Sequence, residues 1–183
     1  MSRISALREE LGGVHPLAAK KVKDHLDQYL SGFISQSPFA VMASSDSDGN
    51  CDASPKGGLP GFIKVVDEKT LLIPDIGGNR LFQSYENFES NPKAGLVFMI
   101  PGMTLTVRVN GRVSLADDAT LAEYVAAPEL NNPDDNSGLV QGMMLEIDEA
   151  YFHCPRAFGF SELWDTDTIT ANGERSVSSL VQD

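Results

Sequence analysis

Residues 39–58 read FAVMASSDSDGNCDASPKGG and predict two strands joined by a tight turn. The first part, 39–44, is a compact apolar run, and the letters DSDGN at 46–50 are typical of a hairpin turn. Residues 51–55 then form the returning strand. The pattern indicates an antiparallel β-protein.

The rest of the chain also predicts strands, with helices between some of them. Further strands are expected at 62–66, 70–74, 94–100, 104–115 and 139–153. Helices are expected at 17–34, 80–90, 119–127 (after the N-cap residue Asp117) and 157–164. Hairpin-linked strands at this spacing predict an antiparallel barrel or sandwich of about six strands, and a barrel removes the exposed edges of a sheet.

Length and charge narrow the class of protein. The 183 residues suit a single domain, with a helical segment at 1–36, a barrel core at 39–164 and a polar tail at 165–183. The formal net charge of −12 argues against nucleic acid and anionic membranes as partners, because both need dense Lys and Arg surfaces. No apolar run reaches the roughly 20 residues that span a bilayer, and the two cysteines form no disulfide framework. We therefore expect a cytoplasmic protein with reduced thiols.

Two glycine-containing segments carry residues that a barrel alone does not need. Residues 52–58 (DASPKGG) bring a hydroxyl, a cation and backbone N–H groups together, which suits a phosphate or an electron-rich ring edge. The alternative is a glycine-rich turn with a solvated lysine. Residues 75–80 (DIGGNR) lead into a helix whose N-terminus favours an anion, and Arg80 can bind phosphate oxygens with its planar guanidinium. Alternatively, Asn79 caps the helix and Arg80 lies on the surface.

Two later segments are weaker candidates. Thr106, Arg108 and Asn110 share one face of a strand, where they line a cofactor site or meet water. His153 and Cys154 end another strand, but no further ligands stand at metal-binding spacing, so no metal is expected. The sequence also lacks the nucleophile elbow, the P-loop and the dinucleotide-binding glycine motif.

Taken together and in this order, these segments resemble the pyridoxamine 5′-phosphate oxidase-like FMN-binding split-barrel family, and within it a bacterial branch of FMN-dependent enzymes. The resemblance covers about residues 39–164 and rests on CDASPKGGLPGF (51–62), LLIPDIGGNRLFQSYENFESNPKAGLVFMIPG (71–102), TVRVNGRV (106–113), YFHC (151–154) and LW (163–164). It implies a mainly β fold with flanking helices, a six-stranded antiparallel split β-barrel, which binds flavin mononucleotide (FMN) at a homodimer interface.

The resemblance also implies a role for each matching position. The residues that match the cofactor-binding positions are Ala53, Ser54, Pro55, Lys56, Pro74, Asp75, Asn79, Arg80, Thr106, His153, Arg156 and Trp164. Lys56 falls near ring or phosphate oxygens of the flavin, Asn79 and Arg80 match the phosphate-binding pair, and Thr106 falls where the oxidase proper has a glutamine that contacts the ring. His153, Arg156 and Trp164 match a segment that reaches the flavin of the other subunit.

The family also suggests a reaction, although no catalytic residue stands out. Electrons would pass from NAD(P)H or another donor through FMN to a small-molecule substrate. Residues 155–161 (PRAFGFS) depart from the pattern of the branch, and the arginine-rich ending of the oxidase proper is missing. We therefore do not expect pyridoxamine 5′-phosphate oxidase activity. The alternatives are a non-catalytic flavin-binding or flavin-sensing protein, and a haem- or deazaflavin-binding relative in which His153 could ligate haem.

Overall fold

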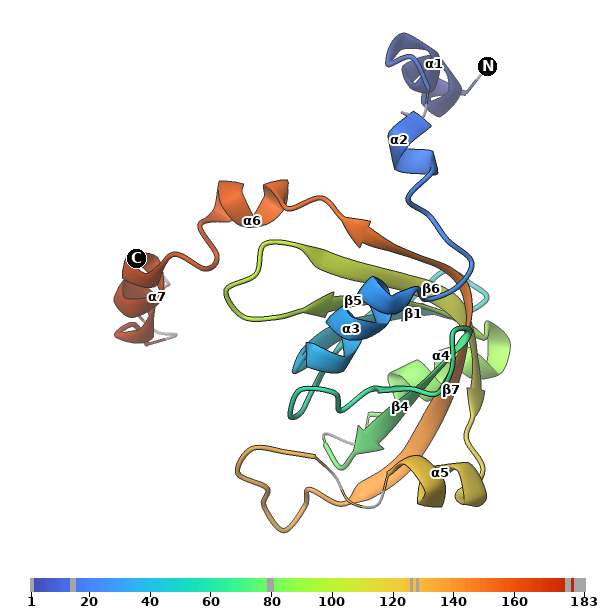
Figure 1. Cartoon of the computed structure of the whole chain (residues 1–183), viewed down its shortest axis with the longest axis vertical. Helices are drawn as coiled ribbons and strands as arrows, with labels where there is room; N and C mark the ends of the chain where they lie inside the picture. The colour runs from blue at the N-terminus through green and yellow to red at the C-terminus, as the bar shows by residue number, and fades with distance from the viewer. Residues whose placement is uncertain are drawn as a thin grey trace.

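One curled antiparallel sheet organises the protein (Figure 1). The computed structural model describes residues 2–13, 16–78, 81–125, 127, 129–176 and 179. Its strands are β1 (Phe39–Ser45), β2 (Cys51–Gly57), β3 (Lys64–Val65), β4 (Thr70–Ile76), β5 (Lys93–Met99), β6 (Thr106–Leu115) and β7 (Leu139–His153). They follow one another across the sheet in the order β2-β1-β5-β6-β7-β4-β3, and every paired neighbour is antiparallel.

The predicted fold class is confirmed, with one correction to the number of strands. The sheet has seven strands in place of the six expected. The shortest of the seven is β3, which pairs with β4 through only two residues. The chain around it turns repeatedly: Gly61 has a positive φ of 82°, and residues 67–70 close the next turn. A strand was expected over all of 62–66, but Phe62 and Ile63 instead enter the core outside any strand.

The hairpin at 39–58 forms as the sequence predicts. β1 and β2 pair without a break from Phe39 opposite Gly57 to Ser45 opposite Cys51. The turn is held by the Asp46 carboxylate, whose Oδ1 accepts from the backbone N–H groups of Asp48 and Asn50, each at 2.9 Å. Asp and Asn favour such turns because their short side chains hydrogen-bond nearby backbone.

The two longest strands give the sheet its curvature. β6 and β7 pair along their length, and the register shifts between Asn110 and Gly111. Such a bulge bends and twists a strand. Gly111 is required there because a Cβ atom at this position would lie 2.1 Å from the backbone oxygen of Glu146.

A large apolar core fills the curled sheet. It receives inward side chains from β1, β4, β5, β6 and β7, and helix α3 (Gln28–Gln36) covers it with Leu30, Phe33 and Ile34. A smaller cluster around Leu72 packs beneath α5 (Asp118–Tyr124). The expected N-cap of α5 is present, since the Asp117 side chain accepts from the N–H of Thr120 at 2.7 Å.

The helix expected at 17–34 is wrong as one element. The chain forms α2 (Pro16–Ala19), then an extended segment in which Lys23 pairs with Ala150 of β7, and then α3. Asp27 starts α3, because its side chain accepts from the N–H groups of Tyr29 and Leu30. The apolar spacing was real, but the backbone between the helices bonds to the sheet instead.

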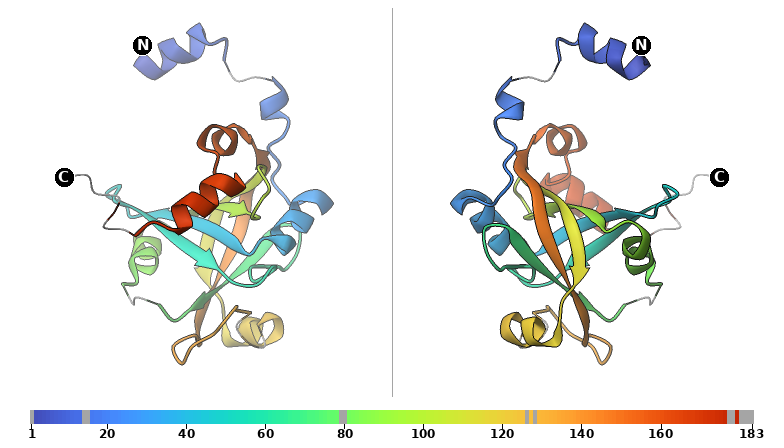
Figure 2. Two further views of the ribbon diagram at one scale, coloured as in Figure 1. Left: turned by 90° about the vertical axis from the view of Figure 1, so that its left-hand side faces the viewer. Right: turned by 90° about the vertical axis from the view of Figure 1, so that its right-hand side faces the viewer.

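The remaining helices flank the barrel or stand away from it (Figures 1 and 2). Helix α4 (Gln83–Ser90) lies against the β1–β2 hairpin, while α1 (Arg3–Glu10), α6 (Arg156–Ser161) and α7 (Thr166–Gly173) project from the barrel. α6 covers part of the helix expected at 157–164, and α7 lies in the expected polar tail. In the described part of the chain, no helix combines the length and the apolar character needed to cross a membrane.

The close backbone contact at Gly111 in the bulge predicts the effect of a substitution on stability. Replacing Gly111 with Ala should lower the free energy of unfolding by about 2–4 kcal/mol, because the new methyl group collides with backbone that cannot move freely. Gly32→Ala in α3 is the matched control: its Cβ meets nothing within 4 Å. That change should be neutral or stabilising by up to ~1 kcal/mol. Urea unfolding would measure both, and equal effects would contradict the role of the bulge.

Candidate functional site

Strand β2 presents two chemically different faces. Asp52, Ser54 and Lys56 are half-buried and point inward, whereas Cys51, Ala53, Pro55 and Gly57 are exposed on the outer face. An inward face of this kind is normally apolar in a barrel. A line of three polar side chains on the inside therefore needs polar partners.

The partners lie across the opening of the barrel. β2 ends the sheet on one side, and on the other side the two-residue strand β3 covers only Leu71 and Leu72 of β4. From Ile73 to the end of β4, the edge that faces away from β7 has no strand partner among the described residues. We call this opening between β2 and the end of β4 the seam.

Three side chains from three elements meet at the seam. The ammonium group of Lys56 on β2 lies 2.7 Å from Oδ1 of Asp75 on β4. The hydroxyl of Tyr85 on α4 donates to the other oxygen, Oδ2, at 3.0 Å. The side chains of Lys56 and Asp75 are only 15% and 17% exposed, so this ion pair is shielded from solvent. The Lys56–Asp75–Tyr85 cluster thus links both edges of the open sheet to a helix.

The environment of Tyr85 keeps its phenol protonated. Burial disfavours the phenolate, and the negative charge of Asp75 disfavours it further, so the pKa of Tyr85 lies well above its ordinary value of 10.0. Tyr85 is therefore a hydrogen-bond donor over the whole physiological range.

Helix α4 is bound to the hairpin by further polar contacts. Ser84 donates to the Asp52 carboxylate at 2.9 Å, and the amide of Asn87 donates to the Ser44 hydroxyl at 2.8 Å. Just past the helix, the Asn91 amide donates to the backbone oxygen of Ser45 at 3.0 Å. These bonds explain why α4 has a polar side facing β1 and β2.

The outer face of the sheet has a different character. Rows of side chains run straight across the strands, as the pairing registers show. One row contains Ala53, Ala43, Gly95, Asn110 and Glu149, and the next contains Pro55, Val41, Val97, Arg108 and Tyr151. The β2–β1–β5 part of both rows is small or apolar, and the β6–β7 part is polar.

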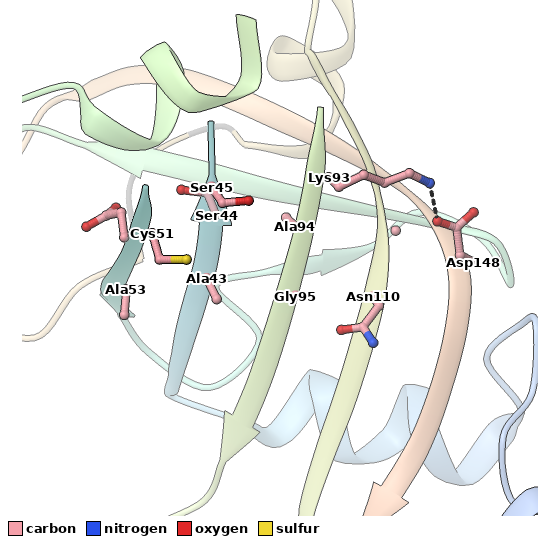
Figure 3. Close-up of a pocket in the computed structure, with 12 residues that line it drawn as sticks. Ala43, Ser44, Ser45, Cys51, Ala53, Lys93, Ala94, Gly95, Asn110 and Asp148 are labelled. Atoms are coloured by element: carbon pink, nitrogen blue, oxygen red, sulfur yellow. Dashed lines mark hydrogen bonds and ion pairs between the residues drawn. The ribbon is translucent and has the colours of Figure 1, made fainter. Parts of the chain in front are cut away.

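The row of small residues leaves a shallow hollow in this face (Figure 3). It has a volume of about 580 Å³, and its lining includes Ala43, Ala53 and Gly95. Asn110 lies on one side, and the ion pair of Lys93 and Asp148, 2.5 Å apart, lies at the rim. A flat molecule or a partner surface would find room here.

Cross-strand pairs order the polar part of the outer face. The Arg108 guanidinium donates to the Tyr151 hydroxyl at 3.2 Å, and the Asn110 amide donates to the Glu149 carboxylate at 2.5 Å. Thr106, which is 2% exposed, pairs with the exposed His153. In the described residues, no three His, Cys, Asp or Glu side chains gather as metal ligands.

The predicted site residues separate into groups. Lys56 and Asp75 meet directly, with Ser54 on the same inward side of β2 and Pro74 buried beside Asp75. Ala53 and Pro55 lie on the opposite, outer face of β2.

Thr106 and His153 sit side by side at the ends of β6 and β7. Asn79 and Arg80 fall outside the described residues, so their predicted phosphate contact stays a prediction.

Arg156 and Trp164 belong to the arm that follows β7. The Arg156 guanidinium lies 5.1 Å from the ring centre of Phe160, and Trp164 stacks on Phe158 with 5.9 Å between ring centres. The indole N–H of Trp164 donates to the backbone oxygen of Met103 in the β5–β6 turn at 2.9 Å. Within one chain, these two residues make their contacts away from the Lys56–Asp75–Tyr85 cluster.

Sequence reasoning missed Tyr85 as a member of the site. In the sequence, Tyr85 shares one face of the expected helix with Leu81 and Phe88, which is the pattern of a packing face. The ring does pack against the core, and its hydroxyl extends to Asp75. The signal that could have found it was the hydroxyl itself, because a buried tyrosine usually finds a hydrogen-bond partner.

Most of the chain matches the model of one known protein family. The model for pyridoxamine 5′-phosphate oxidase matches residues 26–154, which include all seven strands and end where the arm after β7 begins. The chain belongs to this family. No curated protein matches the sequence.

Solved structures share the fold of this chain at low sequence identity. HupZ from Group A Streptococcus superposes with a TM-score of 0.51 at 15% identity, covering 69% of this chain and 93% of HupZ. A candidate pyridoxamine 5′-phosphate oxidase from Lactobacillus delbrueckii gives a TM-score of 0.50 at 22% identity, covering 70% of this chain and 95% of that protein. Both likenesses concern the fold alone.

The raised pKa of Tyr85 predicts how stability changes at alkaline pH. Above about pH 10, the unfolded chain loses the Tyr85 proton while the folded chain retains it, so the stabilisation from this group is complete below pH 10 and declines above it. The advantage of the wild-type protein over Tyr85→Phe in free energy of unfolding should shrink by about 1 kcal/mol between about pH 9 and pH 11. Urea titrations at each pH would test this, and a constant difference would contradict it.

Proposed function

We propose that the protein is an FMN-dependent oxidoreductase that binds FMN at the seam and along the adjoining part of β2. Membership of the pyridoxamine 5′-phosphate oxidase family supports this proposal. The observation that carries it is the shielded ammonium group of Lys56 on the polar inward face of β2. In a chain of net charge −12, a cation held at the opening of a barrel marks a place for an anionic ligand.

The described residues fit such a ligand. A lysine ammonium has three N–H donors, and the recorded bond to Asp75 occupies one of them, which leaves donors for ring or phosphate oxygens. Ser54 adds a hydroxyl on the same side of β2, and the glycines at 57–58 allow backbone to approach closely. Because Asp52 and Asp75 bring two negative charges to the seam, the phosphate needs a further cation, and we assign that part to Arg80 with Asn79.

The other matching positions would complete the site. Pro55 and Ala53 offer a flat apolar edge on the outer face of β2. FMN supplies the electron transfer when it is bound, while the protein orients it and excludes water. The Lys56 charge would stabilise negative charge that develops on the ring.

We further propose that the protein works as a homodimer with the flavin at the interface. The outer-face row of Pro55, Val41 and Val97 is a suitable contact surface, and Phe160 on the arm is 76% exposed in the single chain. His153, Arg156 and Trp164 would then approach the partner's flavin. Light scattering coupled to gel filtration would give the mass in solution, and the mass of a monomer would contradict the proposed homodimer.

Two unpaired cysteines fit a cytoplasmic location.

The visible spectrum of the purified protein is the first test. A flavin spectrum, with FMN identified by mass spectrometry after heat release, supports the proposal. A haem spectrum or a deazaflavin mass would assign the same barrel to a different cofactor, and a protein that stays colourless after addition of FMN overturns it. Rapid mixing with NADH or NADPH then separates an oxidoreductase from a non-catalytic flavin-binding protein, in which the flavin stays oxidised with every donor. The small-molecule substrate would be sought among electron acceptors.

Arg80 gives a specific prediction for the phosphate. Arg80→Ala should weaken FMN binding by about 1.5–3 kcal/mol, the scale of a charge-assisted hydrogen bond. Riboflavin, which lacks the phosphate, should bind the variant and the wild-type protein equally. Fluorescence titration of the flavin-free protein measures both affinities.

Lys21→Ala is the matched control, because Lys21 is an exposed cation before α3. It should leave the affinity for FMN unchanged. If Arg80→Ala lowers riboflavin affinity as much as FMN affinity, Arg80 does not act on the phosphate.

A further inference from the structure

The Asp75 carboxylate uses both of its oxygens, one on Lys56 and one on Tyr85. We propose that Tyr85 and Asp75 are positioning residues that set how strongly Lys56 binds an anionic ligand at the seam. The inference rests on the proposed function for its ligand, FMN. The coupling between the three side chains can be measured without any ligand.

The first step concerns the place of the Lys56 ammonium. The ammonium group of a lysine stands at the end of four flexible methylene groups, and on an open surface this ammonium samples many positions. Here it is 15% exposed and bonded at 2.7 Å to Asp75. The carboxylate therefore keeps the charge at the seam, between β2 and β4.

The second step concerns the strength of that charge. If the Asp75 carboxylate had no other hydrogen-bond donor, both of its oxygens could interact with the Lys56 ammonium, and its negative charge would neutralise that ammonium more fully. Tyr85 prevents this because it occupies Oδ2 from another direction, 3.0 Å away. A neutral donor on Oδ2 shares the negative charge of Asp75, so Lys56 keeps more of its attraction for a second anion.

The third step separates this role from a purely structural one. Helix α4 does not depend on the Tyr85 hydroxyl for its attachment, because Ser84 and Asn87 already bond it to Asp52 and Ser44. The Tyr85 ring packs against the core and tilts against Phe82 with 6.0 Å between ring centres. Tyr85→Phe keeps the ring and removes only the hydroxyl, so it isolates the contact with Asp75.

The first experiment uses the full chain stripped of ligand. The unfolding equilibrium is measured for Tyr85→Phe, Lys56→Met and the double variant. If Tyr85 and Lys56 are coupled through Asp75, the double variant should differ at least about fivefold in unfolding constant from the product of the single effects. Additive effects would overturn the proposal. If Lys56→Met does not fold, Asp75→Asn takes its place in the same cycle.

The second experiment measures FMN affinity in the same variants. Tyr85→Phe should raise the Kd about three- to tenfold when Lys56 is present, the range expected for one hydrogen bond. The same change should have less than about a twofold effect in the Lys56→Met background and in the Asp75→Asn background. An equal loss in all backgrounds would mean that Tyr85 acts on the ligand or the fold directly, which overturns the proposal.

Tyr29→Phe is the control, since Tyr29 lies on α3 with 67% exposure. It should change neither the unfolding constant nor the Kd. Failure of the wild-type chain to bind FMN removes the proposed function. In that case the ligand-free cycle still decides whether Tyr85 and Asp75 control Lys56.

Discussion

The sheet of this protein stops short of closing, and that constraint shapes the rest of the molecule. β2 and β3 end the sheet, and β3 is too short to cover β4 beyond Leu72. Unpaired strand edges attract other chains or must be covered. Here the opening is bridged by side chains, with the Lys56–Asp75 ion pair crossing it and α4 lying over the hairpin beside it. A shielded ion pair costs desolvation, so its value lies in holding the two edges in one arrangement.

The same opening makes β2 a strand with two surfaces. Its inward side chains belong to the seam, while Ala53 and Pro55 belong to the outer face with its hollow. Because residues alternate along a strand, four consecutive positions serve both surfaces. A ligand that passes the edge of β2 would therefore touch both, so one short segment could contribute a large part of a binding site.

Family membership and local geometry answer different questions. The family match establishes the architecture of residues 26–154, and the structural likenesses at 15% and 22% identity extend no further than the fold. Function belongs to sites placed on a fold. The Lys56–Asp75–Tyr85 cluster and the Arg108–Tyr151 pair are properties of this chain, and they give the experiments on the site their specific targets.

The sequence by itself determined the features that depend on neighbours along the chain. The turn at 46–50, the long strand at 139–153 and the Asp117 cap follow from local rules of backbone conformation and hydrogen bonding. The helix expected at 17–34 failed because helical spacing of apolar residues cannot reveal that Lys23 bonds to β7. Only the tertiary structure decided which distant residues meet. Tyr85 comes from a segment predicted correctly as a helix, whereas Asp75 lies just past the strand expected at 70–74, which extends to Ile76 in the structure. The meeting of both with Lys56 depends on how the sheet curls. The bulge at Gly111 bends the sheet, and the shortness of β3 leaves the end of β4 open. Both arise from contacts across the sheet, and the order of residues along the chain does not record such contacts directly.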